Sequence, residues 1–248
     1  MNRIFNMDNK FFVFMGRVAD LIILNLICLV CCIPIVTIGA SLTALFYVTL
    51  KMVRNEESYI IKSFFKSFKE NFKQSTIINL IMLVTAIMLF FDLNISHNLT
   101  GTLSQVLSCI FIAFTFLYLL VFLYIYPLQA KFYNTIKNTF SNSLLMAIRH
   151  LPQTIIMLIV SLIPVAVLFI PDIRIQATLL MLVFLMGMSV IAYINSKFFV
   201  KIFDKYIPEE TDSQEEEFSA ENTDGETALP NTQDTSSETL PHSGDSAL

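Results

Sequence analysis

Residues 18–52 read VADLIILNLICLVCCIPIVTIGASLTALFYVTLKM. Two apolar runs meet here at Pro34, and proline is accepted at the start of a helix but fits badly inside one. Each run has about the 17 to 25 residues that a helix needs to cross the hydrocarbon layer. The stretch therefore predicts a hairpin of two membrane-spanning helices, over residues 11–33 and 35–52.

Similar apolar segments follow along the chain. With 55% hydrophobic residues and 23 Phe, the composition is too apolar for a single soluble core. We expect four further spans, over residues 75–91, 103–126, 154–170 and 175–194. The predicted fold class is all-α, a polytopic membrane helix bundle of about six transmembrane helices within residues 1–207.

The basic residues indicate how such a bundle is oriented. Of the 16 Lys and Arg residues, 15 fall on the same side of the predicted membrane and only Arg174 falls on the other. Basic residues accumulate in cytoplasmic loops. The expected topology has both termini in the cytoplasm, with the short loops near 34–37, 92–102 and 171–174 on the outside.

The C-terminal segment has a different character. Residues 209–248 hold 12 acidic and no basic residues, together with Ser, Thr, Gly and Pro, and have almost no apolar side chains to bury. Such composition is typical of disorder. We expect residues 208–248 to form a disordered acidic tail.

An amphipathic helix is predicted between the second and third spans, at about 57–73. Its apolar residues Ile60, Phe64, Phe68 and Phe72 recur every four residues. Opposite them lies a basic side, formed by Lys62, Lys66, Lys69 and Lys73. The helix either lies in the inner headgroup layer, with aromatics toward lipid, or presents a docking surface to a cytoplasmic partner. A comparable helical pattern covers residues 138–150.

Polar residues inside the predicted spans are few, and they are the natural places to seek a function. Asp20 lies about one turn inside the first span and has Arg17 three residues earlier, so an interfacial ion pair is one interpretation. Asn25 lies deeper, where interhelical hydrogen bonding is the expected role. Either residue could instead belong to a substrate path.

Small residues mark the start of the second span. Gly39 with Thr43, and Ala40 with Ala44, lie four positions apart, a spacing that lets two helices approach closely. Thr37 and Tyr47 are the other polar residues near this hairpin. In the fifth span, Pro164 predicts a kink.

Composition and motifs disfavour several classes of function. The three His residues are not placed to activate a membrane-embedded nucleophile. The four Cys lie in apolar runs without the spacing of a zinc site. The lysines follow the membrane interface and the soluble segment is acidic, which disfavours nucleic acid as a partner. We expect no enzymatic activity, no cofactor and no metal.

A set of short motifs extends over roughly residues 1–200 and is most specific in the first hairpin. It consists of Asp20-Leu21-Ile22, Leu24-Asn25-Leu26, Pro34 to Ala40, Thr43-Ala44, Tyr47, Arg54 to Glu57, Ser63-Phe64-Phe65, Asn71 to Gln74, Tyr126-Pro127-Leu128, Ala130, Phe132, Asn134-Thr135, Lys137-Asn138 and Leu151-Pro152. In these motifs the chain resembles the YesL family of bacterial membrane proteins. The resemblance implies a multi-pass protein of a bacterial plasma membrane, often linked to carbohydrate ABC uptake loci, without an established activity.

Three functional hypotheses follow. The first is an accessory component of carbohydrate uptake that contacts ABC transporter subunits, or another membrane protein, through the helix at 57–73. The second is a self-contained small-solute transporter or channel, whose path is lined by Asp20, Asn25, Thr37, Thr43 and Tyr47. The third is a membrane scaffold or sensor, supported by the acidic tail and the basic inner surface.

Overall fold

The computed structural model describes residues 10–56, 59–98 and 101–206. The chain divides into two compact units, Met1–Lys205 and Tyr206–Leu248. All helices given below belong to the first unit. The expected disorder of residues 208–248 lies outside the described residues.

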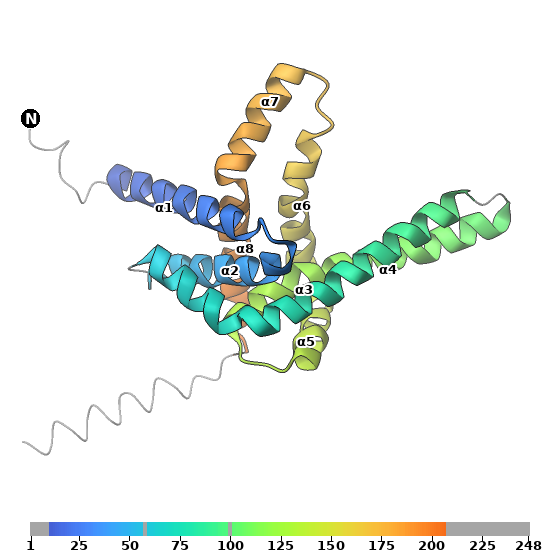
Figure 1. Ribbon diagram of the computed structural model, residues 1–248, viewed down its shortest axis with the longest axis horizontal. Coiled ribbons are helices and arrows are strands. Elements are labelled where there is room, and N and C mark those ends of the chain that lie inside the picture. Colours follow the sequence, from blue (N-terminus) through green and yellow to red (C-terminus); the bar gives the residue numbers. More distant parts are fainter. Residues whose placement is uncertain (1–9, 57–58, 99–100, 207–248) are drawn as a thin grey trace, which may run out of the picture. The chain divides into compact units, whose positions relative to one another are not determined.

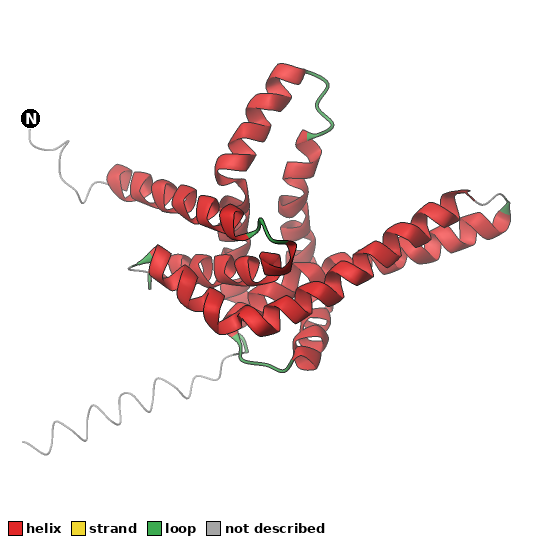
Figure 2. Cartoon of the chain, in the orientation of Figure 1, coloured by secondary structure: helices red, strands yellow, loops and turns green. Residues whose placement is uncertain are grey.

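The described residues are helical and contain no strand (Figures 1 and 2), which confirms the all-α class. Two of the helical segments are not α-helices: η1 is a 3-10 turn and η2 is a π-helix. In chain order the elements are α1 (Lys10–Cys31), η1 (Ile35–Thr37), α2 (Ile38–Arg54), α3 (Ile60–Asn98), α4 (Thr102–Lys131), α5 (Ile136–Arg149), α6 (Leu151–Val167), α7 (Ile173–Leu182), η2 (Val183–Gly187) and α8 (Met188–Phe203).

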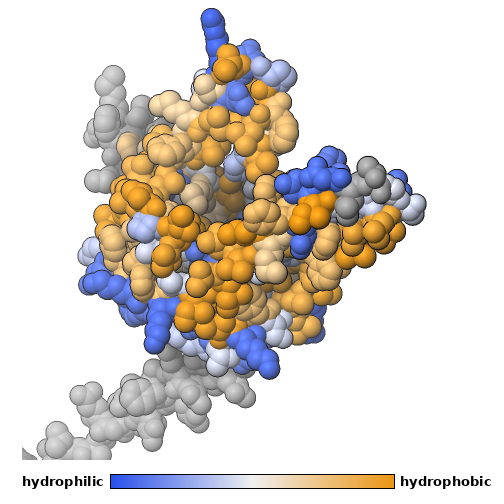
Figure 3. Space-filling view, turned by 45° about the vertical axis from the view of Figure 1, so that its right-hand side comes forward, coloured by the Kyte–Doolittle hydropathy of each residue, from blue (hydrophilic) through white to orange (hydrophobic). Residues whose placement is uncertain are grey.

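The protein is a polytopic membrane helix bundle. Within the described residues, 5 helical runs are long and apolar enough to cross a membrane, or 6 if the bent pair α5 and α6 counts as one span. Figure 3 shows apolar residues over most of the visible face, with hydrophilic residues gathered at its margins. Such an apolar surface is expected of a chain that is surrounded mainly by lipid.

The first hairpin turns at Pro34. The Thr37 hydroxyl donates to the carbonyl oxygens of Cys31 at 2.6 Å and of Pro34 at 2.8 Å, which satisfies backbone acceptors left free where α1 ends. The predicted second span begins at 35, but residues Ile35–Thr37 form the tighter η1 turn and α2 begins at Ile38.

Helix α2 is the central helix of the bundle and contacts α1, α3, α4 and α8. Its buried residues include Gly39, Ala40, Ser41, Thr43 and Ala44. A Cβ added to Gly39 would lie 2.5 Å from the carbonyl oxygen of Ser75 and 2.6 Å from Cβ of Asn79. The small residues at the start of α2 therefore allow α3 to pack directly on its backbone.

Helix α3 differs from the expected pattern. The amphipathic helix at 57–73 and the span at 75–91 are parts of one continuous helix of 39 residues, with residues 57–58 outside the described part. The sequence between them contains neither Gly nor Pro, so nothing interrupts the backbone hydrogen bonds. At 1.5 Å per residue, α3 is about 58 Å long.

The aromatic side of this amphipathic part does not lie mainly in lipid. Phe64 is fully buried in a cluster with Leu24, Leu45 and Val48, and Phe68 packs against the same cluster. Phe72 is more exposed, at 37%. The bundle itself thus covers most of the apolar face that the sequence assigns to lipid or to a partner.

The α3–α4 hairpin is longer than expected. Most of the predicted loop at 92–102 is helical, because α3 continues to Asn98 and α4 begins at Thr102. Serines join the two helices there: Ser96 donates to the carbonyl oxygen of Ser104 at 3.2 Å, Ser104 donates to that of Ser96 at 2.8 Å, and the hydroxyls of Ser96 and Ser108 lie 2.7 Å apart. Helix α4 also continues past the expected end at Tyr126 to Lys131.

The chain bends by 103° between α5 and α6. Pro152 lies in the first turn of α6, where its missing N–H costs nothing. The Thr154 hydroxyl lies 3.1 Å from the Ala147 carbonyl oxygen, 2.9 Å from that of His150 and 2.7 Å from the Tyr124 hydroxyl. This threonine fixes the bend against α4. Helix α6 begins at Leu151, before the expected start at 154, and extends to Val167.

The close contact at Gly39 generates the first prediction. We expect Gly39→Ala to lower the free energy of unfolding by about 1–3 kcal/mol, because the new methyl group overlaps α3 backbone. SDS titration of the purified protein in mixed micelles measures this change. The matched control is Gly16→Ala in α1, where nothing lies within 4 Å of the added Cβ; equal effects of the two substitutions would contradict the close packing.

Candidate functional site

A cleft of about 620 Å³ opens between α1, α2 and the start of α3. Its lining combines charged and apolar groups, which suits an amphiphilic or ionic ligand better than a purely apolar one. The lining residues are Arg17, Asp20, Ile23, Met52, Asn55, Tyr59, Ile60, Ile61 and Lys62. Among them, Asp20 and Lys62 are candidate site residues that the sequence already indicates.

Arg17 connects three helices beside this cleft. It donates to the amide oxygen of Asn55 at 2.5 Å and to the hydroxyl of Tyr193 at 3.4 Å. The sequence suggested an ion pair between Arg17 and Asp20, but the ion pairs in the described part of the chain do not include it. Arg17 is thus held by the end of α2 and by α8, while Asp20 faces the cleft.

Asn55 owes its position to the end of α2. Its φ of 59° places it in the left-handed region, which Asn tolerates better than most residues. Its backbone N–H bonds to the carbonyl oxygens of Lys51 and Met52, closing the helix. This cap directs the Asn55 side chain toward Arg17.

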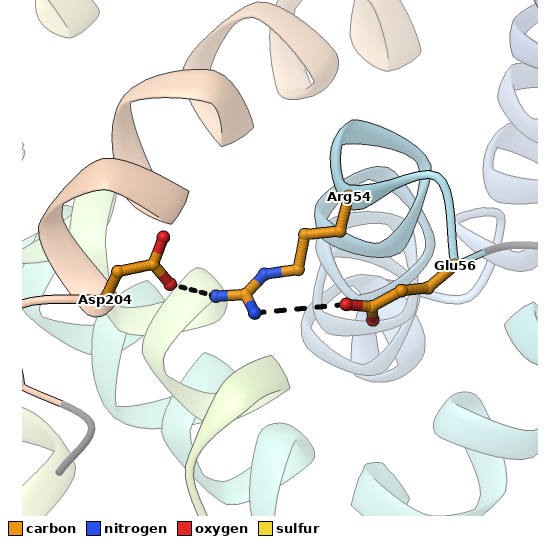
Figure 4. A network of polar contacts seen from close by, with 3 residues as sticks. All are labelled: Arg54, Glu56 and Asp204. Atoms are coloured by element: carbon orange, nitrogen blue, oxygen red, sulfur yellow. Dashed lines mark hydrogen bonds and ion pairs between the residues drawn. The ribbon is translucent and has the colours of Figure 1, made fainter. Parts of the chain in front are cut away.

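A second charged group joins the ends of α2 and α8. Arg54 donates to a carboxylate oxygen of Asp204, and its other terminal nitrogen lies 3.9 Å from Glu56 (Figure 4). Close by is a smaller pocket of about 240 Å³, lined in part by Lys51 and Lys131. Basic residues from α2 and α4 and the acidic residues that directly follow α2 and α8 therefore share one end of the bundle.

The lysine side of α3 is a further surface feature. All four side chains are exposed, and the opposite side of the helix packs into the core through Phe64 and Phe68. Two partly exposed aromatic residues flank the lysines, with Phe65 at 42% and Phe72 at 37% exposure. We call Lys62, Lys66, Lys69 and Lys73 the α3 lysine face.

Asn25 bonds to the π-helix η2. Its amide nitrogen donates to the carbonyl oxygen of Phe184 at 2.7 Å, and its amide oxygen accepts from the Ser189 backbone N–H at 3.1 Å. A π-helix changes which backbone N–H and C=O groups are paired. Here the Asn25 side chain bonds one carbonyl oxygen of η2 and one N–H group just after it, inside the membrane. Asn25 therefore makes the interhelical contacts expected of it, although the sequence around η2 gives no indication of its partner.

The remaining polar residues of the first hairpin lie apart from one another. Thr37 bonds within the turn, and the Thr43 hydroxyl lies 3.0 Å from that of Ser75 on α3. Tyr47 lines the smaller pocket, with the Lys51 ammonium 4.8 Å from its ring centre. The structure thus places Asp20, Asn25, Thr37, Thr43 and Tyr47 in different contacts and does not bring them together along one path.

Other buried polar residues pair between helices in the same way. The hydroxyls of Thr49 and Ser196 lie 2.9 Å apart, and Tyr126 donates to the amide oxygen of Asn79 at 3.0 Å. Asn79 in turn donates to the carbonyl oxygen of Ile35 at 3.1 Å. These contacts need side chains from distant parts of the chain, so sequence reasoning could not pair them.

The cysteines in the first hairpin do not form a metal site. Cys28, Cys31 and Cys32 are free thiols, with the sulfur atoms of Cys28 and Cys32 4.0 Å apart. Within the described residues, no group of 3 or more His, Cys, Asp and Glu side chains could hold a metal ion.

Comparison with protein families yields a match over part of the chain. A family model described as "Protein of unknown function, DUF624" matches residues 21–93. This region contains the second half of α1, all of α2 and most of α3, and so includes Asn25, Gly39 and the α3 lysine face. No match is found among curated proteins or among solved structures.

The contact of Asn25 with η2 generates the second prediction. We expect Asn25→Leu to lower the free energy of unfolding by about 1–2 kcal/mol, because two backbone groups of the α7–η2–α8 run lose their partner inside the membrane. The same SDS titration measures the change. Asn138→Leu, at an exposed position on α5, serves as the control and should leave stability nearly unchanged.

Proposed function

We propose that the protein is a YesL-family member that acts as an accessory component of carbohydrate uptake by ABC-type transport, without enzymatic activity of its own. In this proposal the α3 lysine face is the contact for a transporter subunit or another partner. The observation that supports it is the exposure of all four lysines on a helix whose other side is fixed in the core.

The α3 lysine face is well suited to binding an acidic surface. A surface helix that only rests on lipid would be free to tilt, whereas α3 is anchored by Phe64 in the core and by its contact with α2. Four cations with a fixed spacing favour association with a complementary acidic surface. The exposed aromatic rings of Phe65 and Phe72 add the kind of contact that dominates binding energy at interfaces.

The carbohydrate assignment has a different basis. It rests on the resemblance of the first hairpin and of the segments after it to the YesL family, and the family model that matches residues 21–93 carries no function. The membrane would be the bacterial plasma membrane, with the α3 lysine face and both termini in the cytoplasm.

The separate positions of the polar hairpin residues argue against a self-contained transporter or channel. A solute path needs polar groups that face a common space. Asn25 and Thr43 instead satisfy groups on neighbouring helices. The cleft beside Arg17 and Asp20 is the exception, and it lies at one end of the first hairpin rather than along it.

A crosslinking pull-down under native expression tests the docking proposal. We expect the native chain to recover an ABC permease or ATPase subunit, and a variant with all four lysines of the α3 lysine face changed to Glu to lose it by tenfold or more. The control variant carries the same change in charge on α5 and at the end of α8, through Lys137→Glu, Lys197→Glu, Lys201→Glu and Lys205→Glu. Each of these four lysines is also exposed.

The two variants separate the possible outcomes. Loss of the partner only in the α3 variant supports docking through that face. Equal loss in both variants would indicate a general effect of charge, and recovery of no transporter subunit by the native chain would contradict the proposal. Uptake of oligosaccharides by a deletion strain measures the carbohydrate part separately.

The proposed orientation has its own test. In a chain carrying Cys109→Ala, a cysteine at Pro171 should react with a membrane-impermeant maleimide in intact cells, because it lies in the short connection before α7. A cysteine at Lys137 should react only after the cells are permeabilised. The reverse labelling pattern would place the α3 lysine face outside.

A further inference from the structure

A cavity of about 360 Å³ lies between α2, α4, α6 and α8. Its lining is almost entirely aliphatic and aromatic, and on α2, α4 and α8 the lining residues follow the i, i+3, i+4 spacing of one helical face. On α8 this face consists of Met188, Ile191, Ala192 and Asn195. Asn195 is the exception to the apolar lining, together with Ser161 on α6.

The side chain of Asn195 is buried, and only one of its two polar atoms has a hydrogen-bond partner within the described residues. Its side chain is 1% exposed, and its amide nitrogen donates to the Ser161 hydroxyl oxygen at 2.9 Å. Its amide oxygen is buried and has no hydrogen-bond partner within the described residues. A buried acceptor without a donor is costly, and most such groups in folded proteins have a partner.

The position of Asn195 in the cavity defines how a ligand would lie. From Met188 to Asn195 is about 10 Å along the helix. Lys197, Lys201 and Lys205 follow Asn195 along the chain and are exposed. Asn195 therefore lies at the end of the cavity nearest these lysines, which we call the lysine-rich end. The apolar lining extends from it toward Pro164, inside α6.

We propose that this cavity binds a hydrocarbon chain that ends in a free hydroxyl group, from a lipid alcohol of the membrane. The volume corresponds to roughly a dozen water-sized groups, which suits part of one alkyl chain. Because the Asn195 amide oxygen is itself fully buried, binding requires this side chain to turn slightly toward the cavity, where the oxygen accepts a hydrogen bond from the ligand hydroxyl. Ser161 keeps its own hydroxyl proton when it accepts from Asn195, so it can donate to the same ligand oxygen.

Access to the cavity from the bilayer is provided by its exposed lining residues. Leu162 on α6 is 45% exposed and Phe122 on α4 is 39% exposed, and both line the cavity. A ligand can therefore enter from the side, between α4 and α6, without crossing the polar end of the bundle.

The test compares oleyl alcohol with its methyl ether, which has the same chain and an oxygen acceptor but no donor. Binding to the purified full-length protein is measured by native mass spectrometry, with thermal stabilisation as a second readout. We expect one equivalent of the alcohol to bind about tenfold more tightly than the ether, as the loss of one hydrogen bond to a buried acceptor predicts.

Variants assign the preference to the cavity. Asn195→Leu should bind alcohol and ether alike, Leu162→Trp should weaken the binding of both by filling the entrance, and Asn138→Leu should behave as the native chain. Equal affinity of the native chain for both compounds would mean that water alone serves the Asn195 oxygen and would overturn the proposal. So would an alcohol preference that survives Asn195→Leu, or binding of both compounds that survives Leu162→Trp. If Asn195→Leu does not fold, the native comparison and Leu162→Trp decide.

Discussion

The close approach of α2 and α3 at Gly39 is the constraint on which the rest of the bundle depends. Only a residue without a side chain leaves room for the Ser75 carbonyl and the Asn79 side chain. Once the two backbones touch, Thr43 reaches Ser75, and Asn79 reaches both the η1 turn and Tyr126 on α4. Helix association in lipid lacks the water-driven term that collapses soluble cores, so such backbone contacts and paired polar groups supply the specificity.

Around this contact the protein satisfies its buried polar groups in pairs drawn from different helices. Asn25 serves the shifted backbone of η2, and Thr49 meets Ser196. At the lysine-rich end of the bundle Arg17 donates hydrogen bonds to Asn55 after α2 and to Tyr193 on α8. Arg54 pairs with Asp204 after α8, and solvent weakens this exposed ion pair to about 1 kcal/mol or less. The buried pairs therefore determine the packing of α8, and the exposed charges shape the surface at that end.

The sequence predicts much of the architecture because local chemistry determines it. Pro34 marks the turn of the first hairpin, the spacing of Gly39 and Thr43 predicts close packing, and the depth of Asn25 predicts its interhelical bonds. Contacts between distant segments do not follow from local patterns. Nothing near Arg17 indicates that it prefers Asn55 to Asp20, and the left-handed cap that presents Asn55 becomes visible only in three dimensions. The unpaired oxygen of Asn195 is likewise a property of the packed structure.

The continuity of α3 has a mechanical consequence. One continuous helix carries both the residues that pack on α2 and the lysines. The direction in which the lysines point therefore depends on the number of residues between the two parts. Inserting a single residue near Gln74 would turn the lysines by about 100° relative to the membrane part of the helix. The span itself would remain apolar and long enough. The number of residues in this segment therefore constrains the orientation of the lysines as strongly as their types do. Homologous chains that use the same face should differ here by substitution and not by insertion.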